Sequence, residues 1–172
     1  MQYPISKRVA FLGLFVSFSL VLSYIENLIP VSFAIPGIKI GLSNLAVLLC
    51  LYLFAPLDAL IITLIKAIVS SFLFGNMTML FYSISGAFIS CLCMILVKQI
   101  FKIHIITISA IGGIMHNVAQ LGVAYFIIKS KGIFYYFPYL FLSGLLFGIL
   151  IGFVALILLP YLKKIVKVGE KV

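Results

Sequence analysis

The strongest constraint in this sequence is its series of apolar runs, most of them about as long as a bilayer is thick. A helix needs roughly 20 consecutive apolar residues to cross a hydrocarbon core about 30 Å thick. Of the 172 residues, 65% are hydrophobic and 9% are charged, and the mean hydropathy is +1.37. A soluble domain of this length would carry far more charge. We therefore expect an all-α integral membrane protein, folded as a single membrane domain over residues 1–172.

Prolines, glycines and basic residues divide the apolar sequence into six predicted spans. Proline suits the first turn of a helix but interrupts its interior, so we expect Pro30 to end the first span and Pro160 to end the sixth. The expected spans cover about residues 9–29, 42–55, 57–74, 77–100, 105–128 and 134–161. We expect the first run to be retained and not removed as a signal peptide, because it is longer than a usual signal core.

Basic residues gather on one side of this predicted six-helix bundle. Eight of the twelve lysines and arginines lie in the N-terminus, the loop between spans four and five, and the C-terminal tail. Because positive residues favour cytoplasmic segments, we expect a protein of the cell membrane with both termini in the cytoplasm. The net charge of +9 then reflects helix orientation in the lipid bilayer, and we expect no nucleic-acid partner.

Polar residues inside the spans indicate a ligand site. Lys66 lies about nine residues from either end of the third span, roughly 13 Å from either interface, and a charge at that depth costs about 2.5–3.5 kcal/mol on insertion scales. In the fifth span, Gly113, His116 and Gln120 are expected to share one helix face, with Asn117 adjacent. Such residues can simply join helices by hydrogen bonds, but a cluster this dense favours a lined cavity.

The segment PGIKIGLSN, residues 36–44, places Lys39 between Gly37 and Gly41 just before the second span. Glycine permits unusual backbone geometry, and the N–H groups that open a helix attract anions. We expect this segment, with Asn44, to face outward and to contact an anionic or strongly hydrogen-bonding ligand, although an ordinary turn is the alternative. Glu26 is expected to pair with Lys39 or Lys66, because an unpaired buried carboxylate is costly.

Small residues predict where helices approach closely. Gly144, Gly148 and Gly152 form GxxxGxxxG in the sixth span, a pattern that lets another backbone come near, and we expect it to pack within the bundle. Gly13 and Ser17 form a weaker pattern in the first span, which suits internal packing or a partner surface equally.

Missing residues exclude several chemistries. The chain lacks a GxxxxGK[ST] phosphate loop, and its two histidines have no nearby carboxylates for a catalytic metal. It has a single aspartate, Asp58, whereas prenyl-diphosphate synthases hold magnesium with aspartate-rich clusters. Asp58 is expected to interact with its own helix N-terminus, and Cys50, Cys91 and Cys93 to be reduced apolar fillers. We expect no enzymatic activity, no metal and no cofactor.

Four motifs in order resemble one known family: YIENLIP (24–30), PGIKIGLSN (36–44), LIKAIVSSFLFGN (64–76) and GGIMHNVAQ (112–120). Over about residues 8–160 they resemble the Gx transporter family, also called heptaprenyl diphosphate synthase component I. That family is similar to the substrate-binding S components of energy-coupling factor (ECF) transporters. The resemblance implies six helices, a substrate under the loop between the first two, and contact of Gly13 and Ser17 with a transmembrane coupling subunit that carries two ATPases. Lys66 stands where arginine is expected, which removes a bidentate fork.

The sequence therefore favours a membrane substrate-binding subunit for a small molecule. Its ligand-binding residues are predicted to be Lys39, Asn44, Lys66, His116, Asn117 and Gln120, supported by Glu26, Gly37 and Gly41. The alternatives are an accessory membrane subunit of prenyl-diphosphate or quinone synthesis, and a scaffold of a membrane electron-transfer complex.

Overall fold

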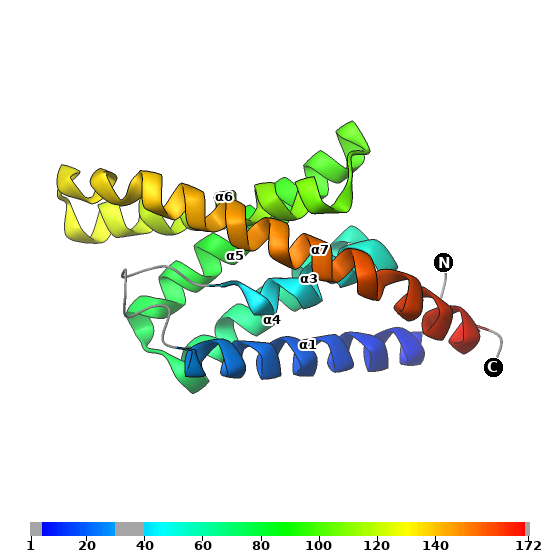
Figure 1. The fold of residues 1–172 in the computed structure, drawn as a ribbon. Coiled ribbons are helices and arrows are strands. Elements are labelled where there is room, and N and C mark those ends of the chain that lie inside the picture. Colours follow the sequence, from blue (N-terminus) through cyan, green and yellow to red (C-terminus); the bar gives the residue numbers. More distant parts are fainter. Residues whose placement is uncertain (1–4, 30–39, 171–172) are drawn as a thin grey trace.

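The computed structural model describes residues 5–29 and 40–170, which form a bundle of helices (Figure 1). The described part of the chain contains no strand, in agreement with the predicted all-α class. The elements are α1 (Ile5–Leu28), α3 (Leu42–Leu53), α4 (Pro56–Phe74), α5 (Met77–Phe101), α6 (Ile105–Ile128), the 3₁₀ helix η1 (Lys131–Tyr136) and α7 (Phe137–Glu170).

Five of the described helices are long and apolar enough to cross a bilayer: α1, α4, α5, α6 and α7. The protein is thus an apolar helical bundle of the multi-pass membrane class. The remaining helix, α3, has 12 residues, which is about 18 Å at 1.5 Å per residue and shorter than a hydrocarbon core. The six-span count therefore stays a prediction.

Helix α3 forms the centre of the bundle. It packs against α1, α4 and α7, and every residue from Ala46 to Leu51 is at most 1% exposed. A helix that is apolar on all sides is covered either by protein or by lipid, and here the neighbouring helices cover it. The position of α3 therefore brings its N-terminal turn into the interior, where the candidate site lies.

Helices α6 and α7 approach closely through glycines, and Figure 1 shows them running together. A Cβ atom added at Gly148 would lie 2.7 Å from the Cα of Ala110, and one at Gly152 would lie 2.7 Å from the Cα of Ile106. These distances leave no room for a side chain. The GxxxGxxxG pattern thus packs within the bundle, as the sequence indicated.

Helix α7 continues past Pro160, where the sequence analysis expected it to end. Proline removes one main-chain hydrogen bond and crowds the preceding turn. Packing on both sides of it offsets this loss, because Leu159 is 8% exposed and Val166 is 4% exposed, and both belong to the main hydrophobic core.

The first turns of α1 and the last turns of α7 lie at the same end of the bundle (Figure 1). Near the start of α1, Arg8 donates from Nε and Nη2 to Oδ1 of Asp58, at 2.9 and 2.5 Å. The other carboxylate oxygen of Asp58 accepts from the N–H of Ala55 at 3.2 Å, at the start of α4. Asp58 therefore caps its helix and also joins α4 to α1, a pairing that the sequence analysis did not predict.

Candidate functional site

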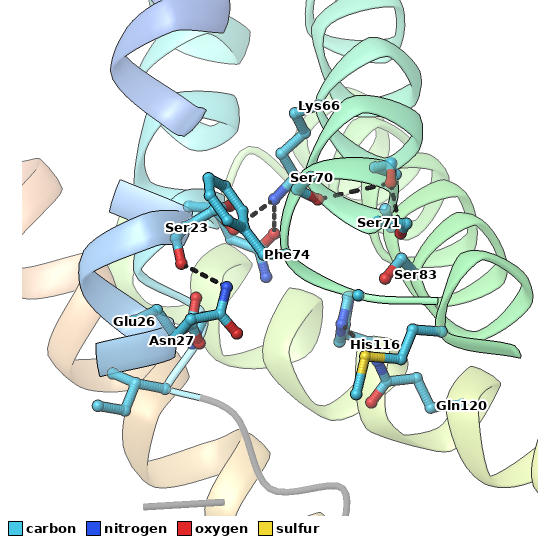
Figure 2. Close-up of a pocket in the computed structure, with 18 of the residues that line it drawn as sticks. Ser23, Glu26, Asn27, Lys66, Ser70, Ser71, Phe74, Ser83, His116 and Gln120 are labelled. Carbon is cyan, nitrogen blue, oxygen red and sulfur yellow. Dashed lines mark hydrogen bonds between the residues drawn. The ribbon is translucent and has the colours of Figure 1, made fainter. Parts of the chain in front are cut away.

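A cavity of about 80 Å³ lies at the other end of the bundle, between α1, α3, α4, α5 and α6. One water needs about 10–15 Å³ on this measure, so the cavity has room for roughly five to eight water-sized groups. Its polar lining residues are Ser23, Glu26, Asn27, Ser43, Asn44, Lys66, Ser70, Ser71, Ser83, His116 and Gln120. Figure 2 shows these helices converging on it.

Lys66 forms part of the cavity wall and is 4% exposed. Its Nζ donates to Oγ of Ser43 at 2.8 Å and to Oδ1 of Asn44 at 2.6 Å (Figure 2). Charge-assisted bonds of this kind are short and strong. They tie the middle of α4 to the first turn of α3 and fix the ammonium group beside the cavity.

Glu26 reaches the cavity from the last turns of α1. Its Oε1 accepts a hydrogen bond from the N–H of Gly41, the residue that precedes α3. Gly41 has φ of 77°, in the left-handed region that favours glycine. A carboxylate is favourable at this positive helix end. The described hydrogen bond of Glu26 thus goes to a backbone N–H. The predicted pairing of Glu26 with Lys39 involves a residue outside the described part of the chain.

His116 and Gln120 line the cavity from α6. The Gln120 amide nitrogen lies 3.1 Å from Nε2 of His116, and the two side chains form a hydrogen bond. Both side chains lie against Gly86 of α5, where an added Cβ would be 2.9 Å from Cε1 of His116. Gly86 therefore makes room for both residues. Sequence reasoning missed it, because a glycine in an apolar helix gives no sign of what faces it.

Asn117 lies in a different place from its neighbour His116. Its Nδ2 donates to the carbonyl oxygen of Leu140 at 2.7 Å and to Oγ of Ser143 at 3.2 Å, both on α7. It lines a smaller cavity of about 30 Å³, which shares Ile40, Gly41, Asn44 and His116 with the first. Gly113 also lines this smaller cavity, and an added Cβ there would strike the backbone of Gly144.

The structure thus brings four of the six predicted ligand-binding residues together on one cavity: Asn44, Lys66, His116 and Gln120. Glu26 and Gly41 also line it, whereas Lys39 and Gly37 lie outside the described residues. Sequence reasoning did not single out Asn27, Ser71 and Ser83. Ser71 carried no helical-face signal, because five residues after Lys66 correspond to about 140° around the helix.

Gly13 and Ser17, predicted to contact a partner, lie on the exposed face of α1, away from the cavity. A Cβ added at Gly13 would meet nothing within 4 Å. Ser19 and Ser23 are a second pair of small residues four apart on this helix, and they are buried at 0% and 7% exposure. The two patterns therefore point in different directions, one outward and one into the bundle.

Within residues 5–29 and 40–170, no group of three or more His, Cys, Asp or Glu side chains is arranged to hold a metal ion. Comparison with protein-family models matches residues 15–158 to the family described as heptaprenyl diphosphate synthase component I. No curated protein and no solved structure matches the chain. Because the match covers well over half of the sequence, the chain belongs to the heptaprenyl diphosphate synthase component I family.

Proposed function

We propose that this chain is the membrane-embedded substrate-binding subunit of a transporter, and that its ligand is a small molecule with an anionic group. Separate coupling and ATPase subunits would supply the energy, since the sequence contains no phosphate loop of its own. The exposed Gly13 and Ser17 face of α1 is the proposed contact for the coupling subunit, in the orientation with both termini in the cytoplasm.

The observation that carries this proposal is Lys66 in the wall of a polar cavity. A lysine buried among membrane helices faces a water-filled or ligand-filled interior and marks a functional site by default. Here Ser43, Asn44 and Lys66 form one hydrogen-bonded group, with His116 and Gln120 also on the cavity wall. This arrangement supports recognition of a hydrogen-bonding, negatively charged group.

The family description favours a second candidate, a non-catalytic membrane subunit that assists prenyl-diphosphate synthesis. In that case the cavity would hold a diphosphate head and would open sideways to lipid. We propose that the chain itself is not the catalyst. Its single aspartate, Asp58, is bonded to Arg8 and Ala55 and is not among the cavity-lining residues. The cavity thus has no aspartate cluster to hold magnesium against diphosphate.

Native mass spectrometry of the purified full-length protein tests the proposal. We expect a co-purified small molecule in the wild type and in Lys163→Met, an exposed lysine on α7 that serves as the control. Lys66→Met should lose it, because a charge-assisted hydrogen bond contributes about 1.5–3 kcal/mol, or roughly 10–150-fold in affinity. Lys66→Arg keeps the charge and should retain part of the binding.

Two results would contradict the proposal. An adduct that persists unchanged in Lys66→Met would show that Lys66 has no role in binding. A bound isoprenoid diphosphate would support the accessory subunit instead.

A further inference from the structure

We propose that the ligand of this cavity is a compact zwitterion, with an anionic group at Lys66 and an ammonium group at Glu26. This inference rests on the proposed function, because it names the substrate class for the same site. It starts from the signs of the charges in the cavity wall and from the way the fold holds each of them.

The described cavity wall contains both signs of charge in equal number. Lys66 is its lysine and Glu26 is its carboxylate, while the other polar lining residues are serine, asparagine, glutamine and histidine. Nε2 of His116 lies 3.1 Å from the Gln120 amide nitrogen, so these two side chains form a hydrogen-bonding pair on the wall. Among these described residues, a polyanion such as diphosphate would meet the cation of Lys66 and the repelling carboxylate of Glu26. A ligand with one charge of each sign matches the wall.

The two wall charges are held by different partners on α3. Lys66 extends from α4 to the side chains of Ser43 and Asn44, whereas Glu26 extends from α1 to the N–H of Gly41. Figure 2 shows Lys66 and Glu26 entering the cavity from different helices. Because each side chain has its own anchor, the positive and the negative ends of the site have fixed positions.

The anchors of Lys66 also prepare a site for an anion. Ser43 and Asn44 accept from Nζ through their oxygens, which directs the Ser43 hydroxyl hydrogen and the Asn44 amide hydrogens to other acceptors. Three kinds of donor therefore gather at this end: ammonium, hydroxyl and amide. A carboxylate or a single phosphate group is the acceptor that suits them.

At the other end, Glu26 has capacity for a cationic donor. A carboxylate offers about four acceptor positions, and its described hydrogen bond, from Gly41, uses one of them. Asn27 lies beside it in the cavity lining. The cavity volume of about 80 Å³ is several times the roughly 10–15 Å³ that one water needs, so it favours a compact ligand.

The test compares matched probes on the full-length protein in nanodiscs. Glycine, β-alanine and γ-aminobutyrate carry both charges at increasing separation, butyrate carries only the anion, butylamine only the cation, and diphosphate is the polyanion. Binding is measured by thermal shift and by isothermal titration calorimetry. We expect at least one zwitterion to bind tenfold or more tightly than butyrate, butylamine and diphosphate.

Glu26→Gln is the decisive variant, because glutamine keeps an oxygen that accepts from Gly41 while the charge is removed. It should abolish the preference for the zwitterion over butyrate and leave the melting temperature of the empty protein close to wild type. Lys66→Met should abolish the preference over butylamine. Lys163→Met, with its exposed side chain, should change neither preference.

The inference is overturned if butyrate or diphosphate binds as tightly as every zwitterion, if Glu26→Gln keeps the wild-type preference, or if no zwitterion binds. If butyrate or diphosphate binds and this binding depends on Lys66, the ligand is not a zwitterion, but the proposed function as a substrate-binding subunit still holds. If no small molecule binds in a way that depends on Lys66, the proposed function is contradicted as well.

Discussion

Gly86→Ala provides a sharp test of whether His116 and Gln120 belong to a ligand site. The added Cβ would lie 2.9 Å from Cε1 of His116, 3.1 Å from its Nδ1 and 3.0 Å from Cγ of Gln120. Ordinary contacts of a Cβ atom fall at 3.4–4 Å. Both side chains must therefore retreat from α5 by about half an ångström, which disturbs the pair of polar groups on the α6 side of the cavity.

The expected magnitude follows from which atoms must move. Overpacking typically costs about 1–3 kcal/mol, and we expect the low end for stability because the obstructing atoms belong to side chains and not to backbone. If one neutral hydrogen bond to the ligand is lost, affinity should fall by about 0.5–1.5 kcal/mol, or roughly two- to twelvefold. Ligand affinity should thus fall although the protein remains folded.

Gly122→Ala is the matched control, since a Cβ added there on α6 meets nothing within 4 Å. Melting temperature and ligand occupancy in native mass spectrometry are measured for wild type and both variants. Reduced occupancy in Gly86→Ala alone is the expected result. Equal occupancy in the two variants, with an intact fold, would refute the assignment of His116 and Gln120 to the site.

Three further predictions concern topology and stability. The variant Gly132→Cys should react with a membrane-impermeant reagent only from outside, and Val168→Cys only from inside. Labelling of Gly132→Cys from the cytoplasm alone would show that the topology is the reverse. Gly113→Ala should lower the melting temperature more than Gly86→Ala, because the added Cβ strikes α7 backbone; equal melting temperatures would contradict this. Arg8→Ala should also lower it by leaving the buried Asp58 carboxylate without its guanidinium, and Asp58→Asn in the same chain should restore part of the loss; no restoration would argue against the pair.

The sequence alone was sufficient for the membrane class and for most helix bounds. The predicted spans 57–74, 77–100 and 105–128 agree with α4, α5 and α6 to within one residue at each end. These ends depend on local signals. Pro56 begins α4, and the Asn76 side chain accepts from the N–H of Met79 at the start of α5.

Four helix ends differ from the predicted bounds by two residues or more: α1 begins at Ile5, α3 ends at Leu53, and α7 begins at Phe137 and ends at Glu170. Tertiary packing accounts for the ends of α3 and α7. The apolar residues after Pro160 pack on the core and carry α7 onward, so a local rule for proline was outweighed. Helix α3 ends two residues earlier than its apolar run indicated, and its shortness is compatible with a position surrounded by other helices. Hydropathy reports that a segment is apolar but not whether lipid or protein covers it.

The polar residues in the cavity were only partly predictable. A lysine or histidine in an apolar helix must face a polar interior, and this reasoning found Lys66 and His116 without any structure. It could not find the partners of Lys66, because Ser43 and Asn44 lie on another helix more than 20 residues away. It assigned Asn117 and His116 to one site, and both line the smaller cavity, but it could not show that Asn117 also bonds to α7.

Helical periodicity determines which residues share a face, and so the sequence determined that polar faces exist on the third and fifth spans. Only the tertiary structure decided which faces meet. The register between helices depends on close packing, such as the glycine contacts of α6 with α7 and the space left by Gly86. That packing joins Glu26 to Gly41 and Lys66 to Ser43 and Asn44, and so decides which charges lie around one cavity.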